Sequence, residues 1–199
     1  MRDDKKASVW SKYTAQDHRA LEELAHGYID FLSICKTERE SVTEAVRLAQ
    51  EAGYLDLADI IAQGTALKEG DKVYAVHMKK AVVLFHIGEA PLAQGMNILG
   101  AHIDTCRLDV KQNPLYEDSG LAYFDTHYYG GIKKYQWVTI PLALHGVVVK
   151  KDGTTIQITL GEREDAPVFC VTDLLVHLSQ DQLEKKASKV IEGEKLDIL

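Results

Sequence analysis

Residues 97–114 read NILGAHIDTCRLDVKQNP, and this stretch decides how the chain is interpreted. It begins with a short apolar run, residues 97–101, which is typical of a β-strand covered on both faces. His102 and Asp104 follow at the end of that run, after which the sequence turns polar. Sites in α/β proteins usually open at the C-terminal ends of buried strands. The stretch therefore predicts a candidate site at His102 and Asp104.

The spacing of His102 and Asp104 has two interpretations. Side chains two residues apart on a strand point to the same face, so a carboxylate can orient an imidazole that binds a metal ion. The same spacing arises by chance in a chain with eight histidines. The residues alone leave a metal site and an ordinary pair both open.

Helix and strand patterns alternate before this site. Apolar residues recur every three or four positions over 14–36, which predicts an amphipathic helix. A capping box at 37–40 and a stop at Gly53 delimit a second helix. The β-rich text over 70–88 predicts a hairpin connected by residues 78–80. The order of these elements indicates an α/β fold.

The sequence after the site is mostly β in character. Asp152-Gly153 between β-formers predicts a second hairpin, and residues 173–189 have a helical period. The change from alternating helix and strand patterns to mostly β patterns predicts two domains, 1–108 and 109–199. The last residues, 196–199, resemble the start of a strand, so we expect the chain to be part of a longer protein.

Composition excludes several classes of partner. The formal net charge of −7 and the isoelectric point of about 5.6 disfavour nucleic acid and anionic membranes as partners. The N-terminal residues lack the apolar core of a secretory signal, and no apolar run is long enough to span a bilayer. Three widely spaced cysteines suit free, buried thiols in a reducing compartment. We expect a cytoplasmic protein.

Four segments in order resemble the aspartyl aminopeptidase and vacuolar aminopeptidase I family of co-catalytic zinc exopeptidases. They read LKEGDKVYAVHMKKAVVLFHIG, GAHIDTCRLDVK, YYGGIKKYQWVTIPLALHGVVV and VFCVTDLLVHLSQDQ. The resemblance covers nearly all of the chain, which would be less than half of a family member. It implies the N-terminal part of an α/β catalytic domain, followed by the start of a mostly β dimerisation insert.

The resemblance also implies roles for three residues. His102 would bind zinc and Asp104 would orient its ring. His177, which by periodicity alone is an ordinary residue of an amphipathic helix, would reach the active site of a partner subunit. Two zinc ions are implied in the complete enzyme, with cobalt or manganese as possible substitutes, together with a peptide substrate and a homo-oligomer.

Two departures limit what the resemblance implies. Trp137 is followed by Val138-Thr139-Ile140 where the family commonly has Phe-Asp-Arg, so a preference for acidic N-terminal residues does not carry over. The other metal ligands and the general base would lie in a later segment, and a two-zinc site needs several protein ligands. The resulting hypothesis is a fragment of a zinc aminopeptidase that is inactive alone. A non-catalytic oligomerisation module and a zinc hydrolase with another substrate are the alternatives.

Overall fold

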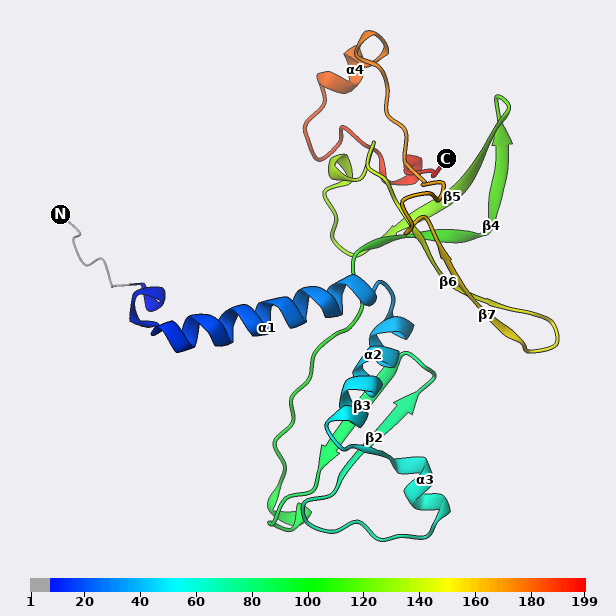
Figure 1. Cartoon of the computed structure of the whole chain (residues 1–199). Coiled ribbons are helices and arrows are strands. Elements are labelled where there is room, and N and C mark those ends of the chain that lie inside the picture. The colour runs from blue at the N-terminus through cyan, green and yellow to red at the C-terminus, as the bar shows by residue number, and fades with distance from the viewer. Residues whose placement is uncertain (1–7) are drawn as a thin grey trace. The chain divides into compact units, whose positions relative to one another are not determined.

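The computed structural model describes residues 8–199, which belong to two compact units, Met1–Ile103 (unit 1) and Asp104–Leu199 (unit 2). Figure 1 shows the elements of both units, and each unit is described by itself. The mixture of helices and strands confirms the α/β class. The boundary between the units falls inside the His102-Ile103-Asp104 motif.

The described part of unit 1 contains both predicted helices, and the second starts where its capping box predicts. A short 3-10 helix, η1 (Val9–Lys12), is followed by α1 (Ala15–Ile34) and α2 (Glu38–Glu51). Thr37 caps α2 by accepting a hydrogen bond from the Glu40 backbone amide, while the Glu40 carboxylate accepts from the Thr37 amide. Gly53 ends the second helix with a φ of 84°, a left-handed conformation that glycine adopts without strain. Both predicted helices are confirmed.

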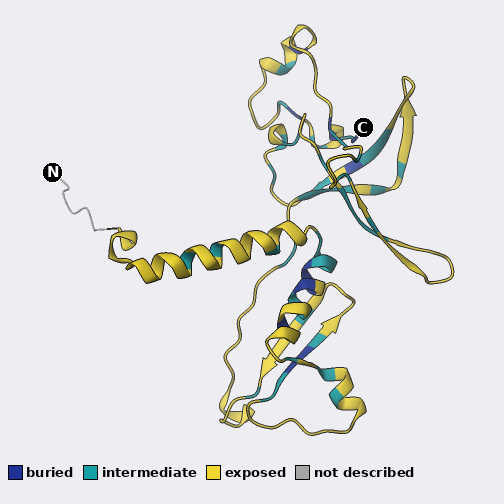
Figure 2. Ribbon diagram, in the orientation of Figure 1, coloured by how far each residue is buried: buried dark blue, intermediate teal, exposed yellow. Residues whose placement is uncertain are grey.

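A three-stranded sheet completes the core of unit 1. Its elements are β1 (Leu55–Asp56), α3 (Leu57–Ala62), β2 (Lys72–His77) and β3 (Ala81–His86), and its strand order is β1-β2-β3. The β2–β3 pair is the predicted hairpin, and Met78 and Lys79 in its turn have positive φ angles. The α2 helix packs on β2 and β3, and Gln50 donates a hydrogen bond of 2.9 Å to the Tyr74 hydroxyl. Figure 2 shows burial in α2 and β2, whereas α1 and β3 are almost wholly exposed.

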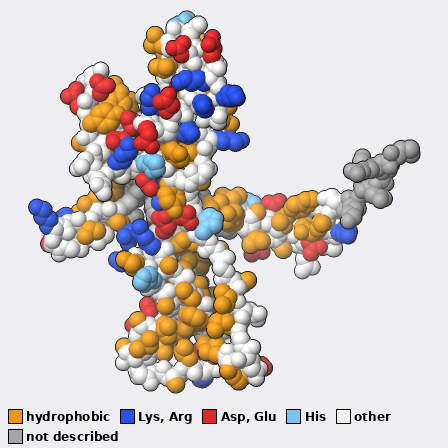
Figure 3. All heavy atoms as spheres, turned by 180° about the vertical axis from the view of Figure 1, so that it is seen from behind, with side chains coloured by type: hydrophobic (Ala, Val, Ile, Leu, Met, Phe, Trp, Pro, Cys, Tyr) orange, Lys and Arg blue, Asp and Glu red, His pale blue; other side chains and the backbone are white. Residues whose placement is uncertain are grey.

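The strand expected over residues 97–101 does not form. After η2 (Leu92–Gln94) the chain is irregular to Cys106, and the side chains of Ile98 and Leu99 are 79% and 100% exposed. A buried strand needs neighbouring strands for its amides and carbonyls, and no strand pairs with residues 97–101 within residues 8–199. Figure 3 shows hydrophobic side chains gathered over one face of unit 1.

Unit 2 is built on a long antiparallel hairpin. Its strands are β4 (Arg107–Asp118) and β5 (Leu121–Tyr129), with a shift of register between Val110 and Leu115. A short 3-10 helix, η5 (Gly193–Lys195), and the residues after it pack beside β5, where Phe124 and Ile198 exchange backbone hydrogen bonds of 2.8 and 3.0 Å. The buried cluster comprises Val171, Ile191, Leu196 and Ile198.

The remaining elements of unit 2 are short. After η3 (Lys134–Gln136), strands β6 (Leu144–Val149) and β7 (Thr155–Leu160) form the hairpin predicted from Asp152-Gly153, and Gly153 has a φ of 85°. The helix predicted over 173–189 is wrong in length, because only η4 (Val176–Leu178) and α4 (Gln180–Leu183) form. An amphipathic helix is stabilised mainly by burying its apolar face. The leucines of this segment are more than half exposed: Leu174, Leu175, Leu178 and Leu183.

Two expectations about the whole chain are refined. No helix among residues 8–199 is long and apolar enough to cross a membrane. The cysteines are free, as expected, but only Cys35 is buried, whereas Cys106 is exposed and Cys170 is partly buried.

Candidate zinc-ligand motif

His102 and Asp104 have different surroundings. His102 is an exposed residue of the irregular segment at the end of unit 1, and it therefore does not lie on the strand that the sequence predicts. Asp104 is partly buried and is the first residue of unit 2. The same-face argument for a strand consequently does not apply, and the connection between the two residues is their spacing in the chain.

Asp104 is held by the end of the long hairpin. The Tyr129 hydroxyl, at the last position of β5, donates a hydrogen bond of 3.1 Å to Asp104 Oδ2. Arg107, the first residue of β4, pairs with Tyr129 in the strand register. The hairpin therefore places the tyrosine beside the start of the segment that contains Asp104.

Arg107 fixes the Tyr129 ring from another side. Its guanidinium carbon lies 4.1 Å from the centre of that ring, a cation–π distance. The same guanidinium donates from Nε to Asp109 at 2.6 Å and from Nη1 to the Thr105 carbonyl at 3.2 Å. These contacts join residues 104–109 to the end of β5.

Glycine at position 130 allows this close approach. Gly130 has a φ of 76°, and a Cβ added there would lie 3.1 Å from Cys106 Sγ. The Cys106 thiol also contacts the Gly131 carbonyl, at 3.6 Å. The Tyr-Gly-Gly sequence therefore supplies a hydroxyl for Asp104 and room for the backbone that follows it.

His177 belongs to another part of unit 2. It is an exposed residue of η4, surrounded in sequence by exposed leucines. Helix α4, which follows η4, lies at the far end of the unit from the start of β4 (Figure 1). The structure thus brings Asp104, Arg107 and Tyr129 together and places His177 elsewhere.

The described residues fit a zinc ion only as part of a ligand set. The imidazole of His102 is a suitable ligand, but structural zinc sites use four protein ligands and catalytic sites usually three. Within residues 8–199 no group of three or more His, Cys, Asp or Glu side chains could hold a metal ion. Any complete site therefore needs ligands from outside the described chain.

The main electrostatic network of unit 2 is separate from Asp104. Lys111 contacts Asp125 at 2.8 Å and Glu194 at 3.2 Å, and His127 lies 3.3 Å from Glu194. The hydrogen bonds that Lys111 donates to Asp125 and Glu194 raise the pKa of Lys111 and lower the pKa of Glu194. A hydrogen bond to Asp197 raises the pKa of Tyr116 to about 12. These contacts hold the C-terminal residues on the hairpin.

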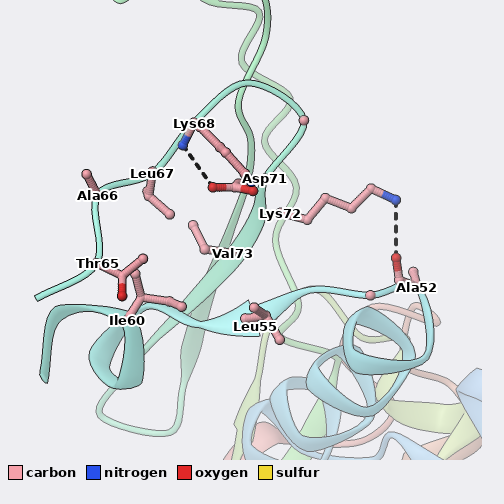
Figure 4. A pocket seen from close by; sticks show the side chains of 12 residues that line it. Ala52, Leu55, Ile60, Thr65, Ala66, Leu67, Lys68, Asp71, Lys72 and Val73 are labelled. Atoms are coloured by element: carbon pink, nitrogen blue, oxygen red, sulfur yellow. Dashed lines mark hydrogen bonds between the residues drawn. The ribbon is translucent and has the colours of Figure 1, made fainter. Parts of the chain in front are cut away.

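A pocket in unit 1 does not contain the predicted site residues. Its volume is about 520 Å³, and its lining includes Leu55, Ile60, Leu67 and Val73 (Figure 4). Lys68 donates its backbone amide to Asp71 at 2.8 Å, and Lys72 donates to the Ala52 carbonyl at 3.2 Å. The Lys68 amide, the Asp71 carboxylate and the Lys72 ammonium are thus engaged with the protein.

Sequence reasoning missed two members of the Asp104 cluster. In the sequence, Tyr129 stands out only as part of the segment that begins YYGG, and Arg107 only as part of GAHIDTCRLDVK. Neither role follows from spacing, because the two residues meet only through the pairing of β4 with β5. The available signal is an aromatic residue followed by two glycines within the mostly β sequence after the site.

Comparison with known proteins agrees with the motif. The profile of the family described as aminopeptidase I zinc metalloprotease (M18) matches residues 31–199. A probable M18 family aminopeptidase 1 of Clostridium acetobutylicum is 58% identical over 192 residues, which cover 96% of this chain and 41% of the relative. Its namesake in Thermotoga maritima is 44% identical over 185 residues, which cover 92% of this chain and 40% of the relative.

Solved structures show the same likeness in three dimensions. The crystal structure of an M18 family aminopeptidase from Thermotoga maritima matches with a TM-score of 0.83 and 42% identity, over 96% of this chain and 40% of that one. The crystal structure of aminopeptidase I from Clostridium acetobutylicum matches with a TM-score of 0.80 and 58% identity, over 95% of this chain and 41% of that one. The chain thus spans about two fifths of the length of these relatives, and it belongs to the M18 family of zinc metalloproteases.

Proposed function

We propose that this chain is the N-terminal part of a zinc-dependent aminopeptidase, which removes N-terminal residues from peptides. Membership of the M18 family carries this proposal, since the similar relatives are named aminopeptidases. The two-domain division at 108/109 stays part of the proposal, whereas the compact units divide five residues earlier.

His102 is the zinc ligand in this proposal, and Asp104 orients its ring. The anchoring of Asp104 by Tyr129 supports the second role, since a carboxylate held in place can fix the direction of an imidazole beside it. When bound, zinc supplies Lewis acidity and the activation of water. Two ions, with cobalt or manganese as substitutes, would be completed by ligands outside this chain.

His177 is the residue proposed to act in a neighbouring subunit. Its ring would donate a hydrogen bond to the substrate or to the oxyanion formed from its carbonyl. The exposed leucines beside His177 support an oligomer, because clustered exposed apolar residues mark protein interfaces. The free cysteines suit a reducing compartment, which supports a cytoplasmic location.

One observation favours a second candidate, a non-catalytic oligomerisation module. Residues 8–199 contain no cluster of three metal-ligating side chains, so these residues do not form a complete metal site by themselves. A zinc hydrolase with another substrate would bind zinc at the same site but would not hydrolyse aminoacyl p-nitroanilides.

Metal analysis of the full-length protein that contains this chain tests the proposal. We expect His102→Ala to lose bound zinc and hydrolysis of aminoacyl p-nitroanilides together, whereas His86→Ala, an exposed histidine of β3, keeps both. A full-length protein that forms oligomers and never takes up zinc would favour the module. Zinc uptake without aminopeptidase activity would favour the other hydrolase.

A further inference from the structure

The Tyr129 hydroxyl is directed at one oxygen of Asp104. It donates to Oδ2 at 3.1 Å, and an ionised carboxylate has two oxygens with about four acceptor positions. Asp104 can therefore accept from Tyr129 and from an imidazole at the same time. A carboxylate that accepts a second hydrogen bond rotates less, which makes it a better support for a metal-binding histidine.

The position of the Tyr129 ring is itself determined by the fold. The ring is at the end of a nine-residue strand and faces the guanidinium of Arg107 at 4.1 Å. Arg107 is held in turn by Asp109 and by the Thr105 carbonyl. Two neighbours in the chain thus hold the arginine, the arginine holds the ring, and the ring presents its hydroxyl to Asp104.

We propose that Tyr129 is a positioning residue for the zinc ligand, acting on His102 through Asp104. This inference rests on the proposed function, because it requires His102 to bind zinc. It also assigns a purpose to the order of residues in Tyr129-Gly130-Gly131: the hydroxyl holds the carboxylate, and Gly130 leaves room for Cys106. Tyr129 does not touch the substrate in this account.

The test measures zinc affinity of the full-length protein by competition with a chromophoric chelator. Tyr129→Phe removes only the hydroxyl, and we expect it to weaken zinc binding about ten-fold, the lower end of the effect of losing a partner that orients a metal ligand. The matched control is Tyr128→Phe, since Tyr128 stacks on His127 at 5.1 Å between ring centres. The control should keep the affinity of the unmodified protein.

A double-mutant cycle shows whether Tyr129 acts through Asp104. If it does, Tyr129→Phe combined with Asp104→Asn binds zinc no more weakly than Asp104→Asn alone. The visible absorption of the cobalt-loaded protein should also change in Tyr129→Phe and stay unchanged in Tyr128→Phe. A merely structural role of the tyrosine would not alter the metal's ligand field.

The outcomes separate this inference from the proposed function. Equal zinc affinity in Tyr129→Phe and Tyr128→Phe, or effects of Tyr129→Phe and Asp104→Asn that add in full, would overturn the positioning role alone. Full zinc occupancy in His102→Ala would overturn the ligand assignment and the positioning role together. Should Tyr129→Phe fail to fold, Arg107→Gln, which releases the ring, must weaken zinc binding or the inference is wrong.

Discussion

The two halves of the His102-Ile103-Asp104 motif are positioned in different ways. Asp104 is tied to the end of a hairpin by Tyr129, and the hairpin is completed within unit 2. His102 lies in an irregular exposed segment whose apolar neighbours, Ile98 and Leu99, are 79% and 100% exposed. The comparison shows that Asp104, the carboxylate proposed to orient the ligand, is placed by the pairing of β4 with β5. Among residues 8–199, no strand pairs with residues 97–101, which lead to His102, the proposed ligand.

Activity of the isolated 199-residue chain is the largest difference that this comparison predicts. Since residues 8–199 hold no group of three metal-ligating side chains and the proposed zinc site needs several ligands, we expect hydrolysis of aminoacyl p-nitroanilides to be lower than in the full-length protein by at least about three orders of magnitude, with zinc, cobalt or manganese added. Brisk turnover by the short chain would refute the missing-ligand argument.

The hairpin that holds Asp104 should depend on the core of unit 2. Leu196 is 0% exposed, and we expect Leu196→Ala to lower the free energy of unfolding by about 2–5 kcal/mol. Urea unfolding followed by Trp137 fluorescence, in a Trp10→Phe background, measures this. The matched control, Leu183→Ala, removes a side chain that is 67% exposed and should change stability by less than about 0.5 kcal/mol. Equal losses of stability in Leu196→Ala and Leu183→Ala would show that Leu196 does not belong to the core of unit 2.

The contact between Asp104 and Tyr129 lies beside Gly130, and substitution of this glycine should lower the free energy of unfolding. Gly130→Ala puts a Cβ 3.1 Å from Cys106 Sγ at a φ of 76°, and the left-handed conformation alone costs about 1–2 kcal/mol for a residue with a Cβ. Gly131→Ala is the control, because no atom lies within 4 Å of its added Cβ. The same urea experiment should show the larger loss in Gly130→Ala. A reversed order would contradict the close approach described above.

The smallest predicted effect is the pH dependence of the Lys111–Glu194 pair. Glu194 has a lowered pKa in the folded protein, so its contribution is present above the unfolded value of 4.5 and is lost as the pH falls below it. Glu194→Gln should slightly reduce the loss of stability between pH 5 and 3. The difference between the variant and the unmodified protein should shrink at high salt, because solvent reaches both groups of the pair. Melting curves from pH 3 to 7 measure it. An unchanged acid limb would show that the pair contributes nothing.

Local signals in the sequence predicted much of the fold. Thr37 and Glu40 satisfy each other's neighbouring amides, so the start of α2 follows from nearby residues. The turn at Asp152-Gly153 is similarly local. The strand expected over 97–101 and the helix expected over 173–189 are wrong, because each needs a partner surface for its apolar side chains that residues 8–199 do not supply.

The candidate site could be predicted only in part. His102 and Asp104 stand out by spacing, and the family resemblance adds His177. The contact of Tyr129 with Asp104 could not be predicted, because 25 residues separate them in the chain and only the β4–β5 register brings them together. Pairing over such a distance depends on the whole hairpin rather than on any short motif.

Zinc stoichiometry tests the central claim most directly. That claim is that this chain supplies one ligand of a zinc site whose other ligands lie outside it. After dialysis against zinc-free buffer, the full-length protein should retain two zinc ions per chain, and the isolated 199-residue chain should retain none. Retention of one or more zinc ions by the isolated chain, lost on His102→Ala, would contradict the claim.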